Sequence, residues 1–106
     1  MPRCLWQVSY TTSGAQGLLK EGGTSRRALV DGLVAGLGGK LEAFYYAFGE
    51  EDAYVIAELP DDASAAAISL AVAGGGGARL KTVPLLTPEQ IDEAAKKSVH
   101  YRAPGA

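Results

Sequence analysis

The stretch from Lys40 to Leu59, KLEAFYYAFGEEDAYVIAEL, constrains the fold most strongly, because two alternating apolar and polar runs flank a short turn of glycine and acidic residues. This pattern predicts a β-hairpin. Helix-like segments lie on both sides of it. The expected order is therefore strand, helix, hairpin, helix, strand, which is that of a ferredoxin-like βαββαβ α+β sandwich with a four-stranded antiparallel sheet.

Start and stop signals bound the elements around the hairpin. A first strand is expected over residues 5–11, a short helix over 15–21 and a longer helix that Thr24 or Ser25 caps. Asp61 or Asp62 is expected to cap a small-sided, largely buried helix that the glycines 74–77 end, before a last strand over 79–84. Thr87, followed by Pro88 and Gln90, predicts a short terminal helix to about residue 98.

Composition narrows the class of protein. The chain of 106 residues is expected to form one domain over 1–106, with residues 99–106 as a tail that adds to a sheet edge or clasps a neighbouring subunit. The net charge is −2 and the ten Lys and Arg residues form no basic stripe, so neither nucleic acid nor a membrane surface is an expected partner. The single cysteine, Cys4, allows no internal disulfide, and no signal-peptide pattern precedes the first strand, so a cytoplasmic location is expected.

The strand pattern also predicts an oligomer. If two helices cover one face of the sheet, strand parity assigns the following residues to the covered face: Trp6, Val8, Tyr10, Leu41, Ala43, Tyr45, Val55, Ala57 and Leu59. The opposite face then carries Leu5, Gln7, Ser9, Glu42, Phe44, Tyr46, Phe48, Tyr54, Ile56 and Glu58. This second surface is too aromatic to be left in water, so two sheets are expected to pack face to face as a dimeric α/β barrel.

Several blocks of the sequence, in order, resemble the GYD domain family. These blocks are the run VSYT, the segment GLLKEGGTSRRALV, the hairpin GGKLEAFYYAFGEED, the stretch LPDDASAAAISLAV and the segment LKTVPLLTPEQID. The Gly-Tyr-Asp motif that names the family aligns with Gly49, Glu51 and Asp52, so glutamate stands in place of the tyrosine. The resemblance implies a ferredoxin-like fold related to the dimeric α/β-barrel proteins and implies no particular activity.

Two groups of residues are candidates for ligand binding. Polar groups inside the expected barrel form the first, and they either line a ligand pocket or satisfy one another across a dimer interface: Gln7, Ser9, Tyr46, Tyr54 and Glu58. The second consists of Lys20, Arg26 and Arg27 around the start of a helix at Gly22 to Ser25, where free N–H groups favour an anion. The alternative for these cations is pairing with Glu21 or Asp31.

The acidic hairpin turn is expected to be structural, with Gly49 permitting the turn and Asp52 bonding to backbone N–H groups, although its carboxylates also suit a hard cation or a general base. No metal site and no cofactor are expected. His100 is the only histidine, so one chain cannot build a multi-histidine site, and Trp6 is expected in the core.

Two classes of function fit these features. The favoured one is a non-catalytic, homo-oligomeric module that binds a small anionic or aromatic ligand or a partner protein and has a regulatory role. The alternative is a small cofactor-independent enzyme, an isomerase or oxygenase, in which protons move among Tyr10, Tyr46, Tyr54, Glu58 and His100.

Overall fold

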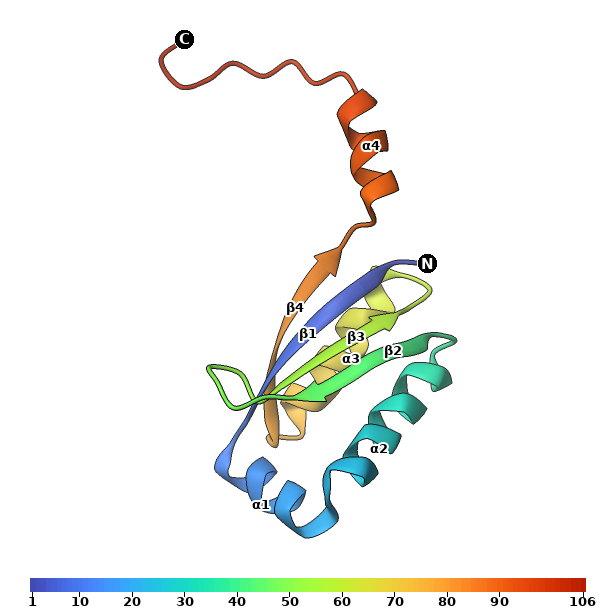
Figure 1. Cartoon of the computed structure of the whole chain (residues 1–106), viewed down its shortest axis with the longest axis vertical. Helices are drawn as coiled ribbons and strands as arrows, with labels where there is room; N and C mark the ends of the chain where they lie inside the picture. Colours follow the sequence, from blue (N-terminus) through green and yellow to red (C-terminus); the bar gives the residue numbers. More distant parts are fainter.

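The computed structural model describes all 106 residues and contains four strands and four helices (Figure 1). In chain order they are β1 (Arg3–Tyr10), α1 (Thr12–Glu21), α2 (Gly23–Gly36), β2 (Lys40–Tyr46), β3 (Ala53–Glu58), α3 (Asp62–Gly74), β4 (Ala78–Leu85) and α4 (Pro88–Lys96). The strands form one antiparallel sheet in the order β2-β3-β1-β4. The expected α+β class and four-stranded antiparallel sheet are confirmed. None of the helices has the length and apolar character required to span a bilayer.

Side-chain caps explain where three of the helices begin. The Asp61 carboxylate accepts a hydrogen bond from the Ser64 N–H at 2.8 Å and begins α3, as expected. Thr87 and Gln90 form the reciprocal pair of a capping box at the start of α4, which is also as expected. α1 begins three residues before the expected helix over 15–21, because Thr11 caps it and accepts from the Gly14 N–H.

The start of α2 differs from the expectation. Neither Thr24 nor Ser25 caps it: the N-cap residue is Gly22, whose φ of 89° is open only to residues that tolerate the left-handed region. α1 ends at Glu21 and α2 begins at Gly23, so this single glycine turns the chain between two helices.

The core lies between one face of the sheet and the helices, with α2 over β2 and α3 over β4. Its largest fully buried side chains are Trp6, Leu59, Val34 and Val55. Within α3 only Ile68 is buried, so the expectation of a largely buried helix is wrong; Leu70 and most of its alanines face solvent. Both helices lie on the same face of the sheet, α2 over one half and α3 over the other, so much of the surface of each helix remains exposed.

A β-bulge in β2 reverses the faces of the hairpin aromatics. Leu41 lies opposite Ala57 and Ala43 lies opposite Ile56, so Glu42 is an extra residue in its strand. Because side chains alternate along a strand, one inserted residue moves every later side chain to the other face. Phe44 and Tyr46 therefore lie on the covered face and Ala43 and Tyr45 on the uncovered face, the reverse of the expectation.

The C-terminal arm, residues 86–106, projects from the body of the molecule (Figure 1). The chain measures 56 × 34 × 23 Å and has a radius of gyration of 16.8 Å, against about 13 Å for a compact chain of this length. Its accessible surface is 7315 Å², whereas a compact monomer of 11.0 kDa exposes about 5,600 Å². Residues 97–106 add to no strand of their own sheet.

Candidate functional site

The face of the sheet opposite the helices carries a mixed polar and apolar surface, which we call the open face. In β1 it comprises Arg3, Leu5, Gln7 and Ser9, which alternate with buried neighbours. The register places the following residues of the other strands beside them: Tyr45, Tyr54, Ile56, Glu58, Arg79, Lys81, Val83 and Leu85. No helix covers this face, because α2 and α3 both lie on the other side (Figure 1).

At one end of the open face, Glu51 joins the hairpin turn to the outer strand. Its Oε2 accepts a hydrogen bond from the Ser9 hydroxyl at 2.7 Å, and its Oε1 accepts from the Lys81 ammonium at 2.9 Å. Glu51 is buried, and it is the one charged residue among the buried residues of the chain. The acid of the turn motif is therefore held by two strands that are distant in sequence.

The partners of Glu51 fix its charge. The hydrogen bond from Ser9, and then that from Lys81, lower the pKa of Glu51 below its ordinary value. The same contact raises the pKa of Lys81, mainly through its hydrogen bond to Glu51. At neutral pH the pair is thus an ionised carboxylate and an ammonium, which suits binding better than proton abstraction.

The neighbouring motif residue, Asp52, fastens the turn to β1. Its Oδ2 accepts from the Tyr10 N–H at 2.8 Å, and its own N–H donates to the Val8 carbonyl. The expected bond from this carboxylate to the backbone is therefore present. Gly49 was expected to permit the turn, but its φ is not positive. The turn conformation therefore does not require a glycine at this position.

The acidic residues of the turn do not converge on one point. Glu51 faces Ser9 and Lys81, whereas Asp52 faces the backbone of β1. No three His, Cys, Asp or Glu side chains of the chain are grouped so as to hold a metal ion.

The other end of the open face carries an ion-pair cluster. The Arg3 Nε lies 2.9 Å from both carboxylate oxygens of Glu42, and a terminal nitrogen of Arg3 lies 2.6 Å from Glu58 Oε1. The hydrogen bond to Glu42 is the main cause of the raised pKa of Arg3. Glu58, a predicted ligand-binding residue, is thus engaged by a cation at the end of the sheet remote from Glu51.

Tyr46, another predicted ligand-binding residue, lies on the covered face because of the bulge. Its hydroxyl donates to the Gly23 carbonyl at 3.0 Å, and its ring packs edge-on against Phe44. Burial raises the pKa of Tyr46 to about 12, so its phenol stays protonated across the physiological range. Tyr46 therefore ties β2 to the start of α2 and does not line the open face.

The basic segment at the start of α2 lies away from the open face. Arg26 is half-buried beside a cavity of about 30 Å³ under α2, with Tyr10 and Phe44. Lys20 and Arg27 are exposed, and none of the three cations forms an ion pair with Glu21 or Asp31.

The residues of the enzymatic alternative do not come together within the chain. Tyr10 and Tyr46 lie on the covered face, Tyr54 and Glu58 on the open face, and His100 in the projecting tail. No single cavity is lined by these five side chains.

Sequence reasoning missed the contribution of β4. Lys81 lies on the same face of β4 as Arg79 and Val83, and this parity was available from the sequence. The strand that neighbours β1, however, is set by the fold, and Lys81 is 30 residues from Glu51.

Comparison with known proteins identifies the family. No curated protein and no solved structure matches the chain. The family model of the GYD domain matches residues 4–95, which include every strand from Cys4 onward and nearly all of α4. The chain therefore belongs to the GYD domain family.

Proposed function

We propose that this protein is a homo-oligomeric, non-catalytic binding module of the ferredoxin-like class, in which two open faces pack together and enclose a ligand chamber. The strand order β2-β3-β1-β4 supports the class. The open face also leaves large apolar side chains exposed, among them Tyr45, Tyr54 and Val83, and an exposed apolar patch of this kind is typical of an interface.

The single observation that carries the proposal is the Ser9–Glu51–Lys81 cluster at the rim of an aromatic sheet surface. Tyr45 and Tyr54 lie directly opposite each other on adjacent strands and offer flat apolar area. Lys81 keeps two-thirds of its side chain exposed while its ammonium contacts Glu51. An aromatic surface beside an accessible cation suits a small aromatic carboxylate, so this is the ligand class we propose.

The ionisation of the cluster favours binding over catalysis. A general base works best when its pKa lies near the working pH, whereas that of Glu51 is lowered. The side chains of the enzymatic alternative also lie on different faces of the sheet.

Assembly is tested by sedimentation velocity on the full chain at about 10 µM, a concentration at which a stable interface is largely formed. A dimer is expected, and Ile56→Lys on the open face should shift the population toward monomer. Leu19→Lys is the matched control, because Leu19 is exposed on α1, away from the open face. A monomeric wild-type chain would contradict the proposed chamber between two open faces.

Ligand binding is tested separately by thermal shift with benzoate, salicylate and indole-3-acetate. A bound probe should raise the Tm through linkage, and Lys81→Met should abolish the rise. Lys40→Met is the control, since Lys40 is an exposed lysine at the far end of β2. If no probe shifts the Tm, or if the two variants respond alike, the proposed ligand class is wrong.

A further inference from the structure

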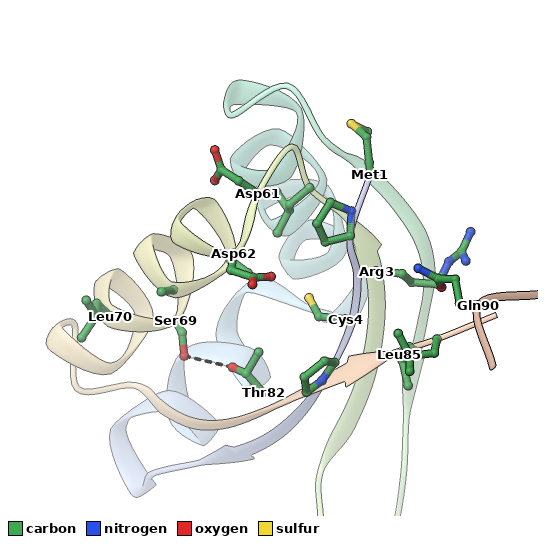
Figure 2. A pocket seen from close by; sticks show the side chains of 16 residues that line it. Met1, Arg3, Cys4, Asp61, Asp62, Ser69, Leu70, Thr82, Leu85 and Gln90 are labelled. Atoms are coloured by element: carbon green, nitrogen blue, oxygen red, sulfur yellow. Dashed lines mark hydrogen bonds between the residues drawn. The ribbon is translucent and has the colours of Figure 1, made fainter. Parts of the chain in front are cut away.

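A second hollow lies between α3 and the outer strand β4, on the side of the sheet that faces the helices. It has a volume of about 870 Å³, within the range of ligand and peptide sites. Figure 2 shows the Cys4 side chain directed into the hollow from β1. Ser69 of α3 and Thr82 of β4 also line it, and their hydroxyl oxygens lie 3.4 Å apart.

The hollow has a largely apolar lining with two kinds of charged group at its edge: Asp61 and Asp62 at the start of α3, and Arg3 of β1, whose charge is already paired with Glu42 and Glu58. Its apolar surface comes from Leu59, Ala65, Ala66, Leu70 and Pro84. Asp62 lies at the start of α3 and its carboxylate is directed toward Cys4 (Figure 2). Burial and then the charge of Asp62 raise the pKa of the Cys4 thiol, which places that negative charge at the hollow. Asp61 beside it is already engaged by Ser64.

The C-terminal arm carries the complementary chemistry. Its apolar side chains Val99 and Tyr101 are among the most exposed in the molecule, at 79% and 77%. They are interleaved with basic groups: Lys96, Lys97, His100 and Arg102. No acidic side chain follows Glu93. Residues 96–102, at the end of the arm, are therefore a basic segment with exposed apolar side chains, and the hollow is a largely apolar site with Asp62 at its edge.

The arm of the same chain is directed away from its own hollow. Only Leu86 and Gln90, at the root of the arm, line the hollow. The capping box then begins α4, whose nine residues carry the chain about 14 Å outward before the tail starts. Figure 1 shows the tail continuing away from the sheet. A segment delivered at that distance is placed to meet another molecule.

We propose that the tail of one copy seats Val99 and Tyr101 in the hollow of a second copy, with its basic side chains beside Asp62. Two copies that exchange arms reciprocally bury both hollows in one symmetric assembly. The tail residues 97–102 span about 20 Å when extended, enough to cross the hollow. This exchange does not depend on the ligand chamber, because the hollow lies on the opposite side of the sheet.

Disulfide trapping between two full-length chains tests the exchange, with both in a Cys4→Ala background. One chain carries Ala66→Cys, on the wall of the hollow, and the other, distinguished by a mass tag, carries Tyr101→Cys. Mild oxidation should join the two chains at least about tenfold faster than it joins Tyr101→Cys to an Ala28→Cys control chain, because docking raises the effective concentration. Ala28 is exposed on α2, away from the hollow. Equal rates, or no joining of the two chains, would overturn the proposal.

A second measurement needs no engineered cysteine. Replacing Val99 and Tyr101 together by Ser should raise the dimer Kd about tenfold or more, since roughly 1.4 kcal/mol of lost apolar burial corresponds to a factor of ten. Leu19→Ser, which alters an equally exposed apolar residue on α1, should leave the Kd unchanged. An unchanged Kd in the tail variant would contradict the exchange even where the trapping variants fold poorly.

Discussion

The Lys81 ammonium contacts the Glu51 carboxylate at 2.9 Å, although 67% of the Lys81 side chain is exposed and only 6% of that of Glu51. Most exposed ion pairs contribute little to stability because water screens them. Here one partner is buried and also accepts from Ser9, so removing either donor leaves a buried carboxylate with an unsatisfied oxygen. The pair is therefore a structural fastening of the hairpin turn as well as a candidate binding element.

Replacing Glu51 by Gln should make stability less dependent on pH. Because the folded-state pKa of Glu51 is lowered, its contribution is present above the unfolded value of 4.5 and is lost as the pH falls through the folded value. The Tm of the wild type should therefore exceed that of Glu51→Gln at pH 7, and the difference should shrink below pH 4.5. Thermal melts from pH 7 to pH 3, with Glu50→Gln as control, check this. A gap that is constant with pH would contradict the assigned contacts.

The β-bulge predicts opposite behaviour for two adjacent aromatic residues. Phe44 packs against the core, so Phe44→Ala should lower the free energy of unfolding by about 2–3 kcal/mol at any protein concentration. Tyr45 is exposed on the open face, so Tyr45→Ala should act only through assembly and its effect should depend on protein concentration. Urea unfolding at two concentrations separates the two cases. A concentration-dependent effect for Phe44→Ala and a concentration-independent loss for Tyr45→Ala would contradict the bulge and indicate a regular strand.

Two glycines of α1 should respond oppositely to alanine. A Cβ at position 14 would lie 1.7 Å from the Gly77 carbonyl oxygen, so Gly14→Ala must displace α1 from the turn before β4 and should cost about 2 kcal/mol or more. A Cβ at position 17 meets nothing within 4 Å, so Gly17→Ala should stabilise the chain by up to about 1 kcal/mol through helix propensity. Chemical unfolding of both variants is the measurement. A stabilised Gly14→Ala would mean that the two segments do not touch.

Loss of the capping box should unfold α4 without unfolding the domain. Thr87→Ala removes the side chain that accepts from the Gln90 N–H, at a cost of about 1 kcal/mol to the helix. Because α4 projects from the core, amide exchange should rise within residues 88–96 while the Tm of the domain at low concentration stays unchanged. Thr24→Ala is the control, since the start of α2 has no side-chain cap. Unchanged exchange in α4 would show that the cap does not hold the helix.

Local signals predicted much of the fold, because they act over a few residues. Patterns of a few neighbouring residues predict the Thr87 capping box, the Asp61 cap and the four strands, and the structure contains all of them. The bulge at Glu42 has no such signature: one extra residue in an alternating run looks like regular alternation, and only pairing with β3 exposes it. For this reason Phe44 and Tyr45 were assigned to the wrong faces.

The candidate site likewise combines residues that local patterns predict with contacts that depend on the order of the strands. Parity placed Gln7, Ser9 and Tyr54 on the open face, where they lie, while their role in binding stays a prediction. The partners of Glu51 depended on the strand order, which brings β4 beside β1, and no spacing in the chain specifies that neighbour. Long-range pairing is chosen by the packing of the whole sheet, so a sequence pattern alone does not reveal it.

The burial of Cys4 provides a built-in reporter of opening. The thiol is almost wholly sequestered, and its raised pKa keeps it in the unreactive protonated form at neutral pH. The chain has a single thiol for an alkylating reagent to modify, and that thiol reacts only when the strand that carries it becomes accessible. The labelling rate of the native protein thus reports how often β1 becomes accessible, without an engineered cysteine.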